Sequence, residues 1–152
     1  MTYQVVVGVD GSAHGEAALR FALAEAEAHQ GEVTAIFAWQ LPFVSIPGAF
    51  DRDQMEKAAK DFLIDTVSAV VPSPAVPLRT LVAEGEPAET LVAASTDASL
   101  LVVGTRGRSP LRGMLVGAVS LRCAAGARCP VVLVKTAADD AELTSGEGTG
   151  EG

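Results

Sequence analysis

Cysteine, histidine and aromatic residues are all scarce in this chain of 152 residues. The two cysteines, Cys123 and Cys129, are too few for a disulfide framework. With two histidines in the whole chain, a four-ligand zinc site is not expected either. We therefore expect both thiols to be reduced, buried and chemically inert.

Long apolar runs are missing as well. None reaches the ~18 residues of a membrane span, and the start, MTYQVVVGVD, lacks the basic segment and long apolar stretch of a signal peptide. The formal net charge of -8 disfavours nucleic acids and anionic membranes as partners, because both need a basic face. We expect a cytoplasmic protein with no nucleic-acid or membrane partner, although a small anion in one local basic pocket stays compatible with the charge.

The chain does contain a regular alternation of short β-branched runs with longer helical segments. Apolar runs predict strands at residues 3–9, 32–39, 78–85, 98–104 and 129–135. Helical spacing predicts helices within residues 10–31, 51–70, 86–96 and 116–127, with Asp10 and Ser12 as candidate caps of the first. This alternation predicts an α/β fold: a single doubly wound, five-stranded parallel sheet with helices on both faces.

The end of the chain has a different composition. Residues 137–152 are acidic and glycine-rich and show no helical or strand periodicity. Such a composition predicts disorder, so we expect one domain over residues 1–136 followed by a disordered tail.

Acidic residues are absent between Asp97 and Asp139. The same interval holds a group of basic residues, namely Arg106, Arg108, Arg112, Arg122, Arg128 and Lys135, and the glycine-rich loop GTRGRSPLRGMLVGAVS at residues 104–120. Glycine exposes backbone N–H groups that can bind phosphate, and the loops after the first and fourth strands should meet at the switch point of the sheet. The loop predicts an anion site, and the alternative is a solvated surface loop.

Three segments carry a family resemblance. The chain lacks G-x-x-x-x-G-K-[ST], and its first turn does not match G-x-G-x-x-G. Instead VVVGVDGS, LLVVGTRGRSPLRGMLVGAVS and CPVVLVK resemble the universal stress protein (UspA-like) family, whose nucleotide-binding members show G-x2-G-x9-G-[ST]. Gly104, Gly107 and Gly117 match that spacing, and the similarity covers roughly residues 3–135. It implies the flavodoxin-like, adenine-nucleotide alpha-hydrolase-like strand order 3-2-1-4-5, and a homodimer through the last strand, Val131 to Lys135.

The resemblance also implies a site for ATP, with magnesium on its phosphates. Asp10 would meet the ribose or adenine side, with Gly8 and Val9 as backbone neighbours, and Ala38 would offer its backbone to adenine. The phosphates would lie against the glycine loop and the start of the helix after it: Gly104, Thr105, Arg106, Gly107, Arg108, Gly117, Ala118, Val119 and Ser120.

Ala118 departs from the family pattern, which has Ser or Thr at this position. The missing hydroxyl would cost a hydrogen bond to a charged group, worth about 1.5–3 kcal/mol or roughly ten- to a hundredfold in affinity. We expect weakened ATP binding, with loss of binding as the alternative, and Ser120 offers a substitute hydroxyl.

Three functions stay open at this point. The first is an ATP-binding module that senses nucleotide or regulates a stress response, the second is a nucleotide-independent interaction or scaffold protein, and the third is a very slow ATP phosphohydrolase. Ser12 and Ser109 lack triad partners, and we expect His14 at the surface without a catalytic role. Asp10 has an alternative role as the cap of the first helix.

Overall fold

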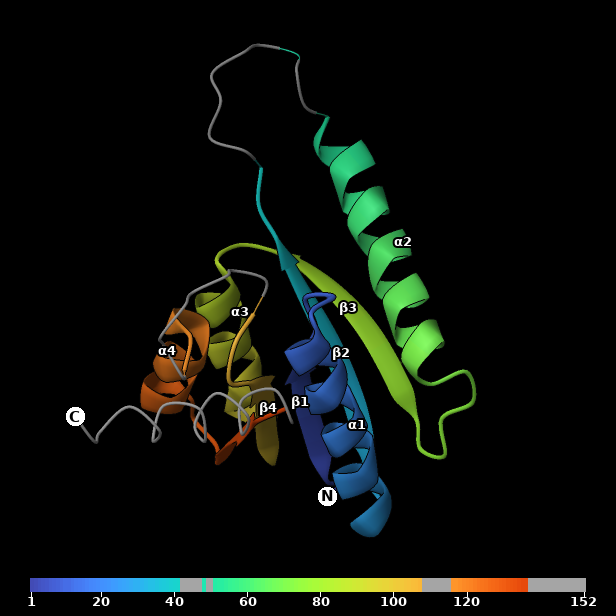
Figure 1. The fold of residues 1–152 in the computed structure, drawn as a ribbon, viewed down its shortest axis with the longest axis vertical. Helices are drawn as coiled ribbons and strands as arrows, with labels where there is room; N and C mark the ends of the chain where they lie inside the picture. Colours follow the sequence, from blue (N-terminus) through green and yellow to red (C-terminus); the bar gives the residue numbers. More distant parts are fainter. Residues whose placement is uncertain (42–47, 49–50, 108–115, 137–152) are drawn as a thin grey trace, which may run out of the picture.

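A computed structural model describes residues 1–41, 48, 51–107 and 116–136, in which strands and helices alternate (Figure 1). The elements are β1 (Gln4–Gly8), α1 (Ala13–Ala28), β2 (Glu32–Trp39), α2 (Arg52–Val70), β3 (Leu78–Glu84), α3 (Pro87–Ala94) with a 3-10 turn (Ser95–Asp97), β4 (Leu100–Gly104), α4 (Ala118–Gly126) and β5 (Val131–Val134). The predicted alternation is confirmed, and the predicted elements differ only at their ends. The predicted tail, residues 137–152, lies outside the described residues.

The strands form one parallel sheet in the order β3-β2-β1-β4-β5, as the resemblance implied. β1 is central: Val5 pairs with Val33 of β2 on one side and with Leu100 of β4 on the other. Because the strands are parallel, their carboxyl ends share one edge, and the winding direction reverses between β1 and β4. Ligands of such sheets bind at that point.

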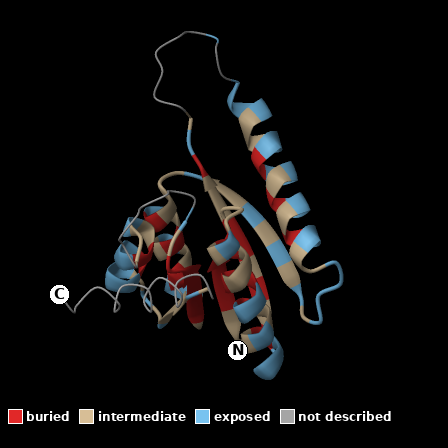
Figure 2. Cartoon of the chain, viewed as in Figure 1, coloured by how far each residue is buried: buried red, intermediate tan, exposed pale blue. Residues whose placement is uncertain are grey.

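Helices cover both faces of the sheet. On one face α1 and α2 pack over a core that includes Leu19 and Leu63, and on the other face α3 and α4 pack over a core that includes Leu101 and Cys123. Figure 2 shows that buried residues concentrate in the central strands, and the buried residues of α1, such as Ala18 and Ala22, belong to the core on the face that α1 and α2 cover. The expected doubly wound architecture is therefore confirmed.

The helix starts decide which backbone groups remain available. Ser12 caps α1 by accepting a hydrogen bond from Gly15 N at 3.1 Å, so the cap is Ser12 and not Asp10. Asp51 and Glu86 cap α2 and α3 with their carboxylates. Helix α4 begins after Gly117 and receives no side-chain cap. Its first N–H groups therefore lack the side-chain acceptor that the other α-helices have.

Candidate functional site

A cavity of about 720 Å³ lies at the carboxyl edge of the sheet, at the switch point. Its size suits a small organic ligand. It is lined by the described residues of the predicted site except Thr105, namely Gly8, Val9, Asp10, Ala38, Gly104, Arg106, Gly107, Gly117, Ala118, Val119 and Ser120. Arg108 lies outside the described residues. The structure thus brings together positions that are far apart in the sequence.

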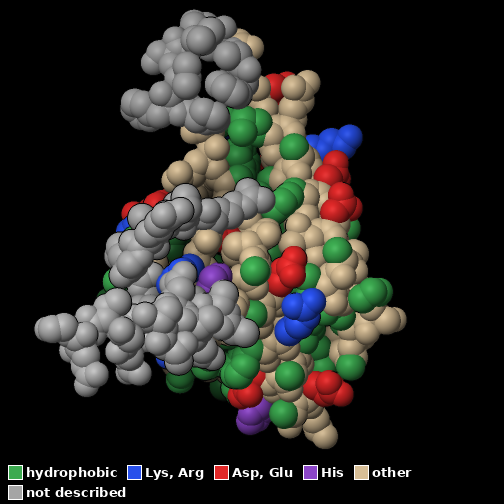
Figure 3. All heavy atoms as spheres, viewed as in Figure 1, with side chains coloured by type: hydrophobic (Ala, Val, Ile, Leu, Met, Phe, Trp, Pro, Cys, Tyr) green, Lys and Arg blue, Asp and Glu red, His purple; other side chains and the backbone are tan. Residues whose placement is uncertain are grey.

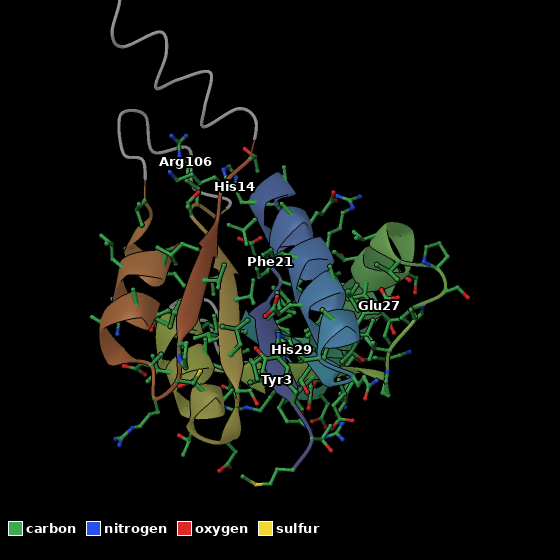
Figure 4. All side chains as sticks on the ribbon, turned by 90° about the horizontal axis from the view of Figure 1, so that it is seen from below. Tyr3, His14, Phe21, Glu27, His29 and Arg106 are labelled. Carbon is green, nitrogen blue, oxygen red and sulfur yellow. The ribbon has the colours of Figure 1, made fainter. Side chains whose placement is uncertain are left out.

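Asp10 supplies the carboxylate of the cavity. Its Oδ1 atom accepts hydrogen bonds from Ser12 N at 2.9 Å and from Ser12 Oγ at 2.5 Å, which hold the side chain in one orientation. Among the described lining residues, Asp10 is the one carboxylate and Arg106 the one guanidinium. Figure 4 shows Arg106 and His14 at the same end of the sheet, opposite Tyr3 and His29. The cavity therefore offers one group of each charge.

The start of α4 forms the positive end of a helix dipole. The first intrahelical bond runs from Leu121 N to Gly117 O at 3.1 Å, so the N–H groups of Ala118, Val119 and Ser120 have no intrahelical acceptor. The first turn of α4 holds no acidic residue. These N–H groups and the dipole favour an anionic group of a ligand.

Gly117 N, by contrast, is already engaged. It donates to Thr105 O at 2.6 Å, while Thr105 N donates to Val134 O at 2.9 Å. Thr105 is buried and does not line the cavity. Thr105 thus joins the end of β5 to the start of α4 and supports the site without facing the ligand space.

Ser120 has a different partner from the one that the sequence suggested. Its buried Oγ donates to Gly104 O at 2.5 Å, which joins α4 to the end of β4. The hydroxyl proton is therefore committed to the main chain in this conformation. A ligand at the first turn of α4 would be bound mainly by backbone N–H groups.

The three glycines of the loop meet different surroundings. A Cβ atom on Gly104 would lie 2.6–2.9 Å from Cβ, C and O of His14, and one on Gly107 would lie 2.8 Å from Asp10 Oδ2. A Cβ on Gly117 would lie 3.5 Å from Thr105 O, an ordinary contact. Close packing against the backbone of α1 therefore requires glycine at Gly104, whereas a side chain at Gly107 would displace the carboxylate of Asp10, and Gly117 has room for a Cβ atom.

An apolar wall completes the cavity, and the sequence analysis did not assign it to the site. It comes from the end of β2, the inner side of α2 and the start of α3: Ile36, Phe37, Trp39, Met55, Ala58, Ala59, Phe62, Pro87 and Leu91. The Phe37 and Phe62 rings are 4.8 Å apart, and Figure 3 shows hydrophobic side chains gathered beside the upper part of α2. The helical spacing of the α2 residues was visible in the sequence, but the same spacing is as typical of a helix face that packs in the core as of one that lines a cavity.

Glu86 neutralises part of the predicted basic segment. Its carboxylate lies 2.9 Å from Arg122 Nη1 and accepts hydrogen bonds from the backbone of α3. Burial alone raises the pKa of Glu86, but the N–H groups of Glu89 and Ala88 and the charge of Arg122 outweigh it and lower the pKa. Arg122 therefore connects α4 to α3 and does not line the cavity.

The two cysteines are free thiols. Burial raises the pKa of Cys123 to about 11 and also raises the pKa of Cys129. Both thiols are therefore protonated at neutral pH and are poor nucleophiles. Cys123 is fully buried, as expected, whereas Cys129 is half-buried.

Metal-ligand clusters and membrane-spanning helices are both missing from residues 1–41, 48, 51–107 and 116–136. Within them, no three His, Cys, Asp or Glu side chains lie close enough together to hold a metal ion. None of the helices there combines the length and apolarity needed to cross a bilayer.

The fold and the cavity define an open α/β domain with a ligand site at its switch point. The model of the Universal stress protein family matches residues 1–135, and the chain belongs to this family. It is 36% identical to Universal stress protein Rv2623 of Mycobacterium tuberculosis over 132 residues, which are 86% of this chain and 44% of the relative. The chain thus spans less than half the length of that relative.

Two solved universal stress proteins share the fold at 25% identity. UspA from Lactobacillus plantarum matches with a TM-score of 0.73 over 87% of this chain and 97% of that one. A universal stress protein in complex with cAMP matches with a TM-score of 0.66 over 87% of this chain and 96% of that one. An adenine nucleotide is thus bound by a structural relative.

Proposed function

We propose that this chain binds an adenine nucleotide, ATP in particular, in the cavity and acts as a nucleotide-sensing or stress-response regulatory module. The observation that carries the proposal is the convergence of Asp10, Arg106 and the start of α4 on one cavity with an apolar wall. These groups match the sugar, phosphate and base of a nucleotide. The bound cAMP of a structural relative supports the same ligand class.

Each part of the nucleotide has a place in this proposal. The base lies along the apolar wall near the backbone of Ala38, the sugar hydroxyls donate to Asp10, and the phosphates lie at the start of α4 beside Arg106. One carboxylate in the described lining is too little to hold magnesium alone, since that ion needs several oxygen ligands. Magnesium would therefore rest mainly on phosphate oxygens.

Nucleotide binding is tested on the purified protein. Denaturation should release adenine nucleotide, and calorimetric titration of the stripped protein with ATP, AMP and cAMP, each with and without magnesium, should give a saturable signal. Gly117→Val should abolish binding and leave the fold intact, because a Cβ atom at this position has ordinary contacts and φ is -76°. Absence of binding at millimolar ATP, AMP and cAMP would contradict the proposal.

We further propose a homodimer through β5 and the residue that follows it, that is, through Val131 to Lys135. β5 is an edge strand whose four apolar residues are each only half-buried, which leaves a backbone edge and apolar surface available to a second copy. Sedimentation should give a dimer for the wild type and a monomer for Leu133→Lys. Leu81→Lys, on the opposite edge strand β3, is the matched control and should stay dimeric. If the wild type is a monomer at every concentration measured, the proposed dimer is wrong.

The second candidate function is a nucleotide-independent interaction protein. Ala118 and the committed hydroxyl of Ser120 favour it, because together they remove side-chain donors from the start of α4. It predicts that ATP changes neither the melting temperature nor the dimer.

The third candidate function is a slow phosphohydrolase. The described lining offers no carboxylate base besides Asp10, so this function is tested by measuring phosphate release from ATP, which Asp10→Ala should abolish. A cytoplasmic location stays a prediction from the sequence.

A further inference from the structure

We propose that Gly107 is a positioning residue for Asp10 and thereby sets how strongly the site selects nucleotides by their sugar hydroxyls. This inference rests on the proposed nucleotide site. It assigns Gly107, which the family pattern places with the phosphates, to the recognition of the sugar.

Glycines enclose the Asp10 carboxylate from two sides. A Cβ atom on Gly15 of α1 would lie 2.7 Å from Asp10 Oδ1, and one on Gly107 would lie 2.8 Å from Asp10 Oδ2. Both distances are shorter than a carbon and an oxygen can approach without a bond between them. The carboxylate keeps its present position only because both of these neighbours lack a side chain. Of the two, Gly107 belongs to the loop that follows β4.

The two carboxylate oxygens have different tasks. Oδ1 already accepts two hydrogen bonds from Ser12, so it anchors the side chain. Oδ2 is the oxygen beside Gly107, and a carboxylate oxygen can only accept hydrogen bonds. A ligand must therefore present a donor to Oδ2, and sugar hydroxyls are the donors that a nucleotide offers there. Displacement of Oδ2 would weaken that bond selectively.

Gly117 provides the contrast within the same loop. It lines the cavity at the start of α4, and a Cβ there would meet Thr105 O at 3.5 Å and Arg106 Cα at 3.7 Å, both ordinary contacts. A methyl group at Gly117 would leave Asp10 in place but would occupy space where a phosphate approaches the N–H groups of α4. The two glycines should therefore affect different parts of the ligand.

The experiment measures the affinities of three ligands, AMP, 2′,3′-dideoxy-AMP and adenosine, for the wild type, Gly107→Ala and Gly117→Ala. The ratio of AMP to dideoxy-AMP affinity reports the sugar contact, and the ratio of AMP to adenosine affinity reports the phosphate contact. In the wild type we expect the sugar ratio to be about ten to a hundred, the value of a hydrogen bond to a charged group. Gly107→Ala should bring the sugar ratio close to one and leave the phosphate ratio unchanged. Gly117→Ala should lower the phosphate ratio and leave the sugar ratio unchanged.

A double-mutant cycle separates positioning from general loss of stability. Asp10→Asn should lower the sugar ratio as Gly107→Ala does, and the double variant should be no worse than either single one, because both changes act on one contact. A variant that merely destabilises the fold would lower the melting temperature and weaken all three ligands equally. That outcome, or additive effects of the two substitutions, would overturn the proposal.

A measurement without ligand keeps this inference distinct from the proposed function. The Ser12 amide donates to Asp10 Oδ1, so its NMR resonance reports the carboxylate position. Gly107→Ala should shift this resonance, and Gly117→Ala should leave it in place. If the Ser12 resonance does not move in folded Gly107→Ala, the positioning role of Gly107 is contradicted, even if the protein binds nucleotide. If the resonance moves but the protein binds no nucleotide, only the proposed function and the sugar selectivity are contradicted.

Discussion

Helices α1 and α2 cover the same face of the sheet but pack on it differently. α1 has small buried residues at helical spacing, including Ala18, Ala22 and Ala26, which let it lie close to the central strands. α2 is longer, with 19 residues, yet its buried residues are only Ala59, Leu63 and Val67. Figure 1 shows its first turns extending beyond the end of β2. The tightly packed helix fixes the polar atoms of the site, and the loosely packed one supplies its apolar wall.

This difference should also appear in stability. A helix whose contacts are few and mostly at one end can open without the rest of the fold. The first turns of α2 should therefore exchange their amide hydrogens faster than α1. The substitutions below compare the two helices, from the largest expected effect to the smallest.

Leu19→Ala in α1 should produce the largest change. Leu19 is fully buried, so the cavity it leaves should lower the free energy of unfolding by about 2–5 kcal/mol. In α2, Ile64→Ala removes a side chain that is 50% exposed and should cost much less. Urea titration gives both values, and equal losses would contradict the difference in burial between these two side chains.

Ala22→Leu reverses the volume change. The added atoms have no space between α1 and the sheet, so overpacking should cost about 1–3 kcal/mol. Ala58→Leu, at an exposed position of α2, should stay within about 0.5 kcal/mol of the wild type. Thermal denaturation followed by circular dichroism measures both, and a destabilised Ala58→Leu would show that α2 is packed more tightly than we infer.

Ser12→Ala and Asp51→Ala remove the caps of α1 and α2. Each should cost about 1 kcal/mol, since either change leaves a backbone N–H group without its acceptor. Ser12 also donates to Asp10, so Ser12→Ala should weaken AMP binding, whereas Asp51→Ala should not. Denaturation and AMP titration together test this, and equal affinities of the two variants would contradict the link between cap and site.

Arg52→Gln should have the smallest effect. Arg52 Nη1 lies 2.7 Å from Glu84 Oε2 and connects the start of α2 to the end of β3, but both side chains are largely accessible to water. Such a pair is worth about 0–1 kcal/mol and is screened by salt. Denaturation at low and at high salt should give a difference only at low salt, and a larger, salt-independent loss would indicate that α2 depends on this contact.

The sequence predicted the fold because its signals were local and consistent. The run Glu32–Trp39 was predicted with its observed bounds, since a buried parallel strand reads as an apolar β-branched run. The strand order came from the family resemblance and not from local signals. The sequence could not decide between Asp10 and Ser12 as the cap, because both side chains can accept a hydrogen bond from the first turn, and the folded structure has Ser12 there.

The site was predicted less completely, for three physical reasons. The hydroxyl of Ser120 and the N–H of Gly117 both donate to backbone carbonyl groups that are more than ten positions away in the sequence. Carbonyl groups are present at every residue, so the sequence could not predict these two hydrogen bonds. Thr105 lies within the loop but does not line the cavity, and its backbone joins β5 to the start of α4. Phe62 and its neighbours on α2 have the spacing of any buried helix face, so the apolar wall needed the tertiary structure.

The central position of β1 has a consequence for how the chain folds. β1 is made before the other four strands of the sheet, but one of its two neighbours is β4, and a hydrogen bond from Gln4 N to Ser99 Oγ spans 95 positions of the chain. Pairings of such long range slow folding. Until β4 is available, the apolar run Val5–Val7 keeps an open edge of the kind that pairs with other chains. A nascent or truncated chain that ends before Leu100 should therefore be prone to aggregate.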